Sequence, residues 1–506
     1  MSSGWKTLLQ QEGVSFSVVN SPDEATLGDF SVIIVTQRLT ESWRESLQKY
    51  AAGGGSLLLA PESFHWLFDG SSVRRNVRTI IPEAASPFSA VNVLDVFGHC
   101  EIPDGAQYLH SESGLPTLLF NQIGEGTMLV LPFDAGELVM DRRSGYKNFY
   151  STGASLPFEL VSLISKGSIR QLVSSSLECL HHRRGLPYCH LWYFPDGVPN
   201  VFILRVDTDF ASEEKVHTLY SVSEDNNVKL TWFVHTQSHE RWLADFAKMP
   251  GHEIGVHCYK HAVLESYGPT RIDIIKALGL LHDAGVKPVG FAAPYGQLTN
   301  AVRRVTEEVG FLYSSEFSYD YDNFPSFPVF NGEEGNVLQI PVHPICIGSF
   351  RGTTSSSEDI TAYFDRVISW KRATHEPLFF YYHPGDGHHP VLTKLMQRCK
   401  GSGTANMVMK DFAQWWKARQ AASYSAEFNE NNLSCVGSVP SSVYLRISRN
   451  SSEALVPFQS SIDMPSLTWK DKAVPTPLPA DIGRIRQFSV RKARQSMQDF
   501  LTRERL

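Results

Sequence analysis

The sequence lacks the features of membrane-spanning, secreted and nucleic-acid-binding proteins. Its longest apolar runs, such as SVIIV and TLLF, are far shorter than the roughly 20 residues that a membrane-spanning helix requires, so no transmembrane segment is expected. The first residues, MSSGWKTLLQQEG, do not combine a basic segment with an apolar run and a cleavage site, as a secretion signal does. Lys and Arg (46) are fewer than Asp and Glu (53), and the net charge of −7 gives no basic excess for binding nucleic acid.

Cysteine is also scarce. The seven cysteines are scattered and form no CxxC pair, so no small disulfide framework is indicated. Scattered thiols in odd number fit a reducing compartment, and we expect a cytoplasmic protein. The stretch ECLHHRRGLPYCH, residues 178–190, holds two cysteines and three histidines, but their spacing matches no structural zinc pattern and favours a surface turn.

The overall composition is that of an ordinary globular protein, with 42% hydrophobic and 20% charged residues. A length of 506 residues predicts roughly three domains. The changes in pattern along the chain predict an α/β domain at 1–165, a connector at 166–200, a barrel at 201–420, a linker with a small β-rich region at 421–483, and a basic helix at 484–506.

The first of these domains alternates short apolar runs with helical stretches, which predicts a flavodoxin-like layer of parallel strands and helices. The segments GGGSLLLAPESF and GEGTMLVLPFDAGEL resemble strand ends of the amidotransferase-like fold. Such an enzyme needs a nucleophilic cysteine on a tight strand-to-helix turn, and Cys100 in FGHCEIPDG has no such turn around it. We therefore interpret this domain as structural or as a binding module.

Residues 201–420 repeat a strand-then-helix pattern, which predicts a (β/α) barrel or a doubly wound sheet with its chemistry at the carboxyl ends of the strands. The strands are expected at 201–206, 229–234, 253–256, 290–293, 338–341 and 378–382. The helices include 271–284, 301–309, 359–373 and 410–419.

Polar residues gather at these strand ends. Asp207 and Asp209 alternate on one strand and so share a face, and His257 and His261, four apart on a helical turn, also face one way. One carboxylate with two imidazoles forms a facial set for a divalent metal ion, which we expect to be zinc, held by Asp209, His257 and His261.

The remaining strand ends supply acid, base and oxyanion groups. Asp207 would accept a proton from metal-bound water, and His383, at a late strand end, would protonate the leaving group. The amide of Tyr295, in a turn set by Pro294 and Gly296, would stabilise the oxyanion. Together these groups predict the hydrolysis of an amide or ester. His252 is interpreted as a loop residue, and His388 and His389 as rim residues.

Residues 201–420 resemble the polysaccharide deacetylase (NodB homology) family. The stretches RVDTDF, GHEIGVHCYKH and YYHPGD are similar to motifs of that family. The resemblance implies a distorted (β/α) barrel and metal-dependent removal of acetyl groups from N-acetylated sugars. It implies the same roles for Asp207, Asp209 and His383, and substrate contacts at Pro294 and Asp386.

The family has a further motif between GHEIGVHCYKH and YYHPGD, its third in chain order, and here the sequence departs from the family. Where the family has Arg-x-Pro-Tyr, with an arginine that orients the base, this sequence has Ala292-Ala293-Pro294-Tyr295. Arg205 and Lys260 are the candidates to replace that charge. In place of the fourth motif stands SYDYDNFP, whose Asp320 and Asp322 are both candidates for the site.

The predicted function is therefore metal-dependent N-deacetylation of a carbohydrate. Two alternatives stay open: hydrolysis of a non-sugar amide, and an inactive barrel that binds metal and glycan, which Ala292 favours. The basic segment at 484–506 carries the apolar residues Phe488, Met497, Phe500 and Leu501. It is interpreted as a helix docked on the protein by these residues, with weak contact to a membrane surface as the alternative.

Overall fold

The computed structural model describes residues 1–83, 86–153, 155–478 and 481–502. It divides into two compact units. The first unit comprises residues 1–141, 164–197 and 418–477, and the second, called the barrel unit below, comprises 142–163, 198–417 and 478–506. Each unit therefore combines segments that are far apart in the sequence.

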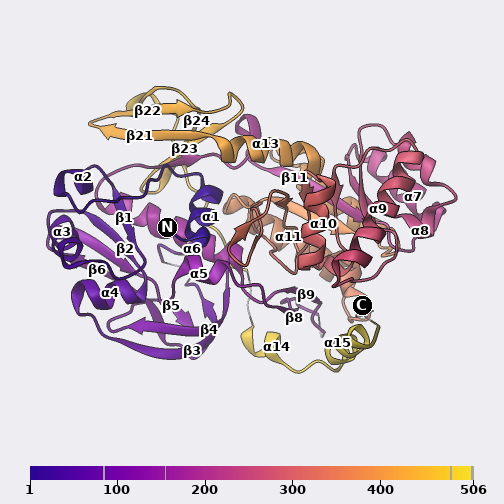
Figure 1. Ribbon diagram of the computed structural model, residues 1–506, viewed down its shortest axis with the longest axis horizontal. Helices are drawn as coiled ribbons and strands as arrows, with labels where there is room; N and C mark the ends of the chain where they lie inside the picture. Colours follow the sequence, from indigo (N-terminus) through magenta and orange to yellow (C-terminus); the bar gives the residue numbers. More distant parts are fainter. Residues whose placement is uncertain (84–85, 154, 479–480, 503–506) are drawn as a thin grey trace. The chain divides into compact units, whose positions relative to one another are not determined.

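The sheet of the first unit is mixed rather than parallel throughout (Figure 1). Its strand order is β1-β2-β7-β6-β5-β3-β4. The strands are β1 (Val32–Val35), β2 (Ser56–Leu59), β3 (Ser72–Ile81), β4 (Leu94–Pro103), β5 (Tyr108–Ser111), β6 (Pro116–Ile123) and β7 (Gly126–Val130). The predicted parallel pairing is present in β1-β2-β7, whereas the other pairs are antiparallel. The reason is local: β6 and β7 are joined by two residues, of which Gly124 has φ of 56°, and so short a connection can only form a hairpin.

Residues 166–200, interpreted from the sequence as a connector, instead contain the long helix α6 (Lys166–Arg183). Apolar residues at helical spacing, including Ile169, Leu172, Val173, Leu177 and Leu180, are buried in the core of the first unit. The other helices of this unit are α1 (Ser3–Glu12), α2 (Glu24–Gly28), α3 (Glu41–Ala52), α4 (Pro61–Phe68) and α5 (Ala135–Val139). The histidines and the arginine in the last turn of α6 lie beyond its apolar stripe.

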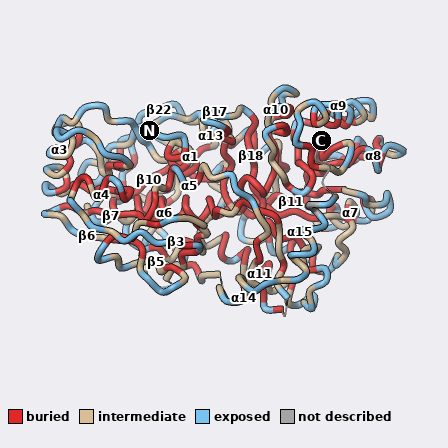
Figure 2. Tube along the Cα trace, turned by 60° about the horizontal axis from the view of Figure 1, so that its bottom comes forward, coloured by how far each residue is buried: buried red, intermediate tan, exposed pale blue. Residues whose placement is uncertain are grey.

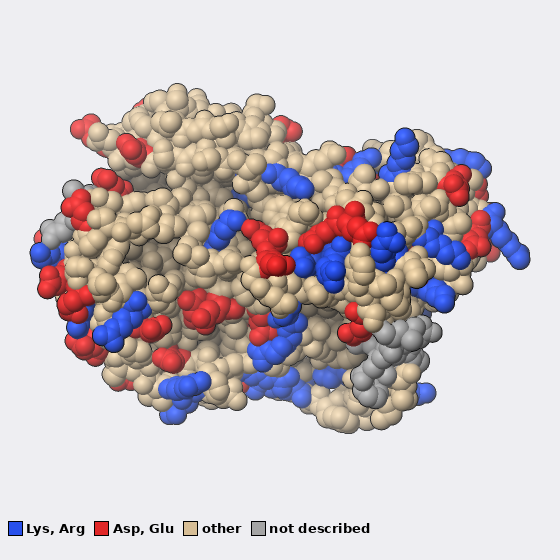
Figure 3. Space-filling view, viewed as in Figure 1, with Lys and Arg blue, Asp and Glu red and all other residues tan. Residues whose placement is uncertain are grey.

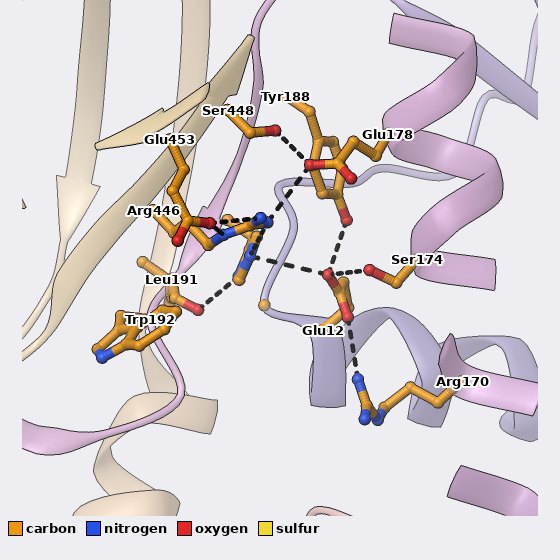
Figure 4. A network of polar contacts seen from close by, with 12 residues as sticks. Glu12, Arg170, Ser174, Glu178, Tyr188, Leu191, Trp192, Arg446, Ser448 and Glu453 are labelled. Atoms are coloured by element: carbon orange, nitrogen blue, oxygen red, sulfur yellow. Dashed lines mark hydrogen bonds and ion pairs between the residues drawn. The ribbon is translucent and has the colours of Figure 1, made fainter. Parts of the chain in front are cut away.

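A buried polar network joins α1, α6 and the strands that follow (Figure 4). The carboxylate of Glu12 accepts hydrogen bonds from Ser174 at 2.7 Å and from Tyr188 at 2.8 Å, and Arg170 lies 3.4 Å away. Burial opposes ionisation, but His190 and Arg170 keep the pKa of Glu12 below its usual value. The ionised carboxylate therefore ties α1 to α6.

The predicted β-rich region at 421–483 forms two small antiparallel sheets. One has the order β10-β23-β24-β26, with β10 (Tyr188–Leu191), β23 (Tyr444–Arg449), β24 (Ser452–Pro457) and β26 (Lys470–Asp471). The other has the order β21-β22-β25, with β21 (Ser423–Asn429), β22 (Asn432–Ser438) and β25 (Ser461–Asp463). Since β10 comes from the supposed connector, this region is part of the first unit.

The barrel unit is built on a curled parallel sheet with the order β18-β15-β14-β13-β12-β11-β19. Its strands are β11 (Val201–Asp207), β12 (Thr231–His235), β13 (Glu253–Cys258), β14 (Gly290–Phe291), β15 (Tyr313–Ser314), β18 (Leu338–Gln339) and β19 (Leu378–Tyr382). The amide of His343, after β18, donates to Phe379 of β19 at 2.8 Å, so the two ends of the sheet approach each other. The result is a distorted half-barrel, in which each strand predicted from the sequence is present.

Helices surround this sheet (Figures 1 and 2). They include α7 (Glu213–Asp225), α8 (Thr236–His239), α9 (Tyr267–Asp283), α10 (Asn300–Val309), α11 (Ser357–Ala373), α12 (His389–Lys400) and α13 (Met409–Ala421). Figure 2 shows β11 buried, while the outer faces of α7 and α9 are exposed. The hairpin of β8 (Ser144–Asn148) and β9 (Phe158–Ser162) also belongs to this unit, because the amide of Ser162 donates to Phe317 at 3.0 Å.

Within the described ranges, we find no helix with the length and hydropathy to cross a bilayer.

Candidate metal and catalytic site

The three predicted metal ligands meet at the carboxyl ends of β11 and β13. Asp209 follows β11, His257 lies in β13, and His261 follows that strand. Oδ1 of Asp209 lies 3.3 Å from Nε2 of His257 and 3.2 Å from Nε2 of His261. Ligand atoms about 2.1 Å from a tetrahedral ion are separated by about 3.4 Å, so the spacing fits an ion such as zinc.

The hydrogen bonding of His257 also fits a metal ligand. Its Nδ1 donates to the carbonyl oxygen of Ala292 at 2.7 Å, which fixes the proton on that nitrogen when the ring is neutral. Nε2 of His257 and Oδ1 of Asp209 are buried and have no hydrogen-bond partner among the described residues. Lone pairs that face each other at this distance repel unless a cation or a proton lies between them, so the arrangement is suited to a cation.

The turn between the histidines is not helical, contrary to the prediction from their spacing. His257 is in a strand and His261 is in the bend beyond it. The amides of Tyr259 and Lys260 donate to the carboxylate of Asp273, on α9, at 2.9 and 2.7 Å. This carboxylate fixes the bend that returns His261 to Asp209.

The predicted base, Asp207, forms a buried ion pair with Arg205 on the same strand. Nε and Nη2 of Arg205 donate to the two carboxylate oxygens of Asp207 at 2.7 and 2.6 Å. A third donation, from Nη1 of Arg205 to the carbonyl oxygen of Ser315 at 2.5 Å, holds the guanidinium in place. Burial works against ionisation of Asp207, but the guanidinium of Arg205 lowers its pKa below the usual value. The carboxylate is thus ionised, oriented and able to accept a proton.

Arg205 therefore supplies the charge that the third motif lacks at Ala292. The other candidate, Lys260, contributes its backbone amide to Asp273, and no ion pair joins its side chain to Asp207 in the described residues. The sequence signal for Arg205 is alternation: residues 205, 207 and 209 are two apart, and side chains two apart on a strand share a face.

His383 lies on the opposite side of Asp209 from β13, after β19. Its Nε2 is 3.7 Å from Oδ2 of Asp209, and its Nδ1 is 3.1 Å from Oδ2 of Asp386. Burial would lower the pKa of His383, but the two carboxylates raise it well above its usual value. The contact with Asp386 also fixes the orientation of the imidazole, as a general acid requires.

Asp386, assigned to substrate from the sequence, turns toward His383 instead. Besides the imidazole, its carboxylate accepts the amides of His383 and Gly348, both at 3.2 Å, and only 8% of its side chain is exposed. These contacts make Asp386 a positioning residue for His383. Cys346 also lies close, with Sγ 3.9 Å from Nδ1 of His383.

Two exposed aromatic rings flank His261. Phe210 is 70% exposed, with its ring centre 5.4 Å from that of His261, and Tyr295 is 45% exposed at 4.8 Å. Tyr295 has φ of 56°, a left-handed conformation that costs free energy for a non-glycine residue. The buried Pro294 precedes it in the 3-10 turn Pro294–Gly296, which fixes where the Tyr295 ring and amide lie.

His235, at the end of β12, was missed in the sequence although it obeys the same strand-end rule. Its Nδ1 lies 2.8 Å from the carbonyl oxygen of Asp209, and burial lowers its pKa to about 4. His235 is therefore neutral at pH 7 and supports the backbone of Asp209, whose φ is 44°. A buried Glu316, also missed, accepts the amide of Ala293 at 3.2 Å behind the site.

The other candidates from the sequence serve the fold. Asp320 accepts the side chain of Asn323 at 2.8 Å, and Asp322 pairs with His343 at 2.9 Å and Lys371 at 2.8 Å, so neither lines the site. His252 accepts the indole N–H of Trp232 at 3.1 Å. The cysteines and histidines of residues 178–190 form no metal-binding group in the described part of the chain.

Comparison with known proteins agrees with this geometry. Residues 199–314 match the model of the polysaccharide deacetylase family. The chain therefore contains a polysaccharide deacetylase domain, and the resemblance seen in the sequence is confirmed for this range, whereas the amidotransferase-like resemblance of the first domain stays a prediction. No curated protein matches the sequence.

Several solved structures are similar to part of the chain. A protein assigned as a polysaccharide deacetylase from Mycobacterium smegmatis is 19% identical, with a TM-score of 0.39, and the match covers 47% of this chain and 96% of that one. Puue allantoinase is 16% identical, with a TM-score of 0.38 and coverage of 45% and 93%. A CE4 family pseudoenzyme from Bacillus anthracis is 13% identical, with a TM-score of 0.30 and coverage of 42% and 66%. At these levels of similarity, the relatives assign neither an activity nor a substrate to this chain.

Proposed function

We propose that the barrel unit is a metal-dependent hydrolase that removes N-acetyl groups from a carbohydrate, with zinc as the metal. The observation that carries the proposal is the joint placement of an oriented base, a three-residue cation site and an acid. Asp207, two residues before Asp209, is held by Arg205, and Nε2 of His383 lies 3.7 Å from Oδ2 of Asp209. A protein that only bound glycan would need no such acid and base.

Each residue has a distinct role. Asp209, His257 and His261 would hold the ion, which when bound polarises the acetamide carbonyl and makes water more acidic. Asp207 accepts a proton from the attacking water, and Arg205 keeps that carboxylate ionised and oriented until it does so.

His383 donates its proton to the departing amine nitrogen, and Asp386 fixes the imidazole and stabilises its charged form. The amide of Tyr295 would donate to the oxyanion. The rings of Phe210 and Tyr295 would contact the apolar face of a sugar ring and orient the acetamide between acid and base.

The experiment measures bound metal and acetate release in the same samples. Wild-type protein should bind about one zinc per chain and release acetate from N-acetylated oligosaccharides. Asp209→Ala and His257→Ala should lose both properties, whereas Asp207→Asn should keep the metal and lose about 10²- to 10⁴-fold in kcat.

His217→Ala is the matched control. It removes a histidine from another acid–histidine group, Glu213, His217 and Asp245, which lies outside the candidate site. If His217→Ala lost the metal and His257→Ala retained it, the ion would bind at the Glu213, His217 and Asp245 group and not at the candidate site. Full metal binding with no acetate from any N-acetylated sugar, but with hydrolysis of a linear or cyclic amide, would redirect the proposal to a non-sugar substrate.

A further inference from the structure

The last helices of the barrel unit, α14 (Ile482–Arg486) and α15 (Val490–Thr502), are attached through polar side chains. Arg484 donates to the carbonyl oxygens of Ser151, at 3.2 Å, and Gly153. Arg491 donates to the carbonyl oxygen of Ser349 at 3.4 Å, and its guanidinium lies 5.0 Å from the ring centre of Phe158. Arg484 and Arg491 therefore face the protein, whereas Arg494 is exposed.

Four apolar side chains of the same segment face outward. Phe488 is 81% exposed, Val490 73%, Met497 65% and Leu501 73%. Residues 490, 497 and 501 are seven and four apart, so on α15 they form a single stripe. The expectation that this helix docks through Phe488, Met497 and Leu501 is therefore wrong, and the side chain of Phe500 lies outside those that the structure describes.

This orientation is the reverse of that of an ordinary surface helix, which buries its apolar stripe against the core. Leaving four large apolar side chains in water costs free energy that an apolar environment would recover. The stripe is thus suited to a partner with an apolar layer.

The charge of the segment indicates which partner. Residues 484–506 contain seven Lys and Arg but two Asp and Glu, whereas the whole chain has a net charge of −7. Figure 3 shows blue atoms at the place where Figure 1 draws α14. An apolar stripe within a basic segment matches the acyl boundary and the anionic headgroups of a lipid surface. A second copy of the chain would bring two basic segments together, which like-charge repulsion opposes.

We propose that α15 binds the surface of an anionic phospholipid bilayer. Val490, Met497 and Leu501 enter the boundary between headgroups and acyl chains, and basic residues such as Arg494 contact the phosphates. This inference does not depend on the proposed enzymatic activity. The contact of Arg491 with Ser349, next to the Gly348 amide that holds Asp386, would bring the rim of the candidate site close to the lipid.

The test is co-sedimentation of the full chain with vesicles of phosphatidylcholine, with and without phosphatidylglycerol. Binding should require phosphatidylglycerol and should weaken as the salt concentration rises from about 0.1 M to about 0.5 M. The double variant Met497→Glu and Leu501→Glu should lower the partition coefficient by about tenfold or more, because it places two charges in the apolar stripe. Both positions are exposed, so folding, checked by circular dichroism, should not change.

Ile272→Glu is the matched control, since Ile272 is 70% exposed on α9 of the same unit and lies outside the segment. It should bind vesicles like the wild type. Absence of binding to anionic vesicles, or equal binding by the double variant, would overturn the proposal. If light scattering shows that the wild type is a dimer and the double variant a monomer, and neither binds vesicles, the stripe contacts a second copy of the chain instead.

Discussion

Replacing Arg205 with methionine should destabilise the barrel unit by about 3–5 kcal/mol, because it leaves a buried carboxylate without its partner. The side chain of Arg205 is fully buried and that of Asp207 is 5% exposed, and two charge-assisted hydrogen bonds of 2.7 and 2.6 Å join them. Asp207→Asn should also destabilise, since it weakens the same pair from the other end. When both substitutions are combined, the cost should fall short of the sum by about 1–3 kcal/mol.

The measurement is urea-induced unfolding of the wild type, the two single variants and the double variant, followed by circular dichroism. The free energies of unfolding are taken from the transition that the substitutions shift. Arg271→Met with Glu308→Gln provides a matched control, because this pair also lies at 2.7 Å but its side chains are 46% and 36% exposed. The double-mutant cycle of this exposed pair should give an interaction free energy of about 0–1 kcal/mol.

The reasoning about Arg205 fails if its cycle with Asp207 is additive to within about 0.5 kcal/mol. It also fails if Arg205→Met keeps the wild-type rate of acetate release. The pKa of Asp207 is lowered in the folded state, so the stabilisation is present above the pKa of the unfolded chain and is lost as the pH falls through the folded value.

Three further outcomes follow from the geometry. Asp273→Ala should weaken zinc binding by about 10- to 100-fold in a competition titration, since the bend that places His261 loses its anchor, while Asp273→Asn should recover part of the affinity. Phe210→Ala should raise KM for an N-acetylated oligosaccharide about 2- to 10-fold at unchanged kcat, and an equal change for acetylated substrates without a ring would contradict the stacking role. Glu178 has a pKa of about 2, because burial is outweighed by Arg446 and its cationic neighbours. The free energy of unfolding should therefore fall as the pH drops below about 4.5, and Glu178→Gln should flatten that dependence, which unfolding at a series of pH values measures.

The strands and several helices of the barrel unit could be predicted because each carries its own periodic signal. The runs at 201–206 and 378–382 are apolar throughout, as expected for parallel strands covered on both faces, and they form β11 and β19. Helix α12 was missed although Val391, Leu392, Leu395 and Met396 have helical spacing, because the adjacent His388 and His389 were interpreted as a rim.

The first unit was harder to predict because its pairing depends on contacts between distant segments. Short apolar runs fit parallel and antiparallel strands equally, and only the turn at Gly124 distinguishes β6-β7 as a hairpin. The burial of α6 likewise depends on residues from both ends of the chain, such as Glu12 and Arg446. A pattern read over one window of sequence contains no information about such partners.

The replacement of the missing third-motif arginine shows where sequence reasoning about the site reaches its limit. Arg205 and Lys260 both lie within a few residues of predicted site groups, so the sequence alone leaves two candidates. The backbone distinguishes the two candidates. Residues 205 and 207 lie on one face of β11, whereas in the bend after β13 the amide of Lys260 donates to Asp273. The guanidinium of Arg205 also lies between the rings of Phe233 and Tyr381, at 5.4 and 5.9 Å from their centres, which shields the pair from water.

Because Arg205 lies two residues before the base on the same strand, the backbone of β11 fixes the distance between the two side chains. The ionised state of Asp207 therefore depends on the integrity of β11 and not on the loop that carries Ala292. The alanine at position 292 therefore leaves the base with its cationic partner, as an active enzyme requires.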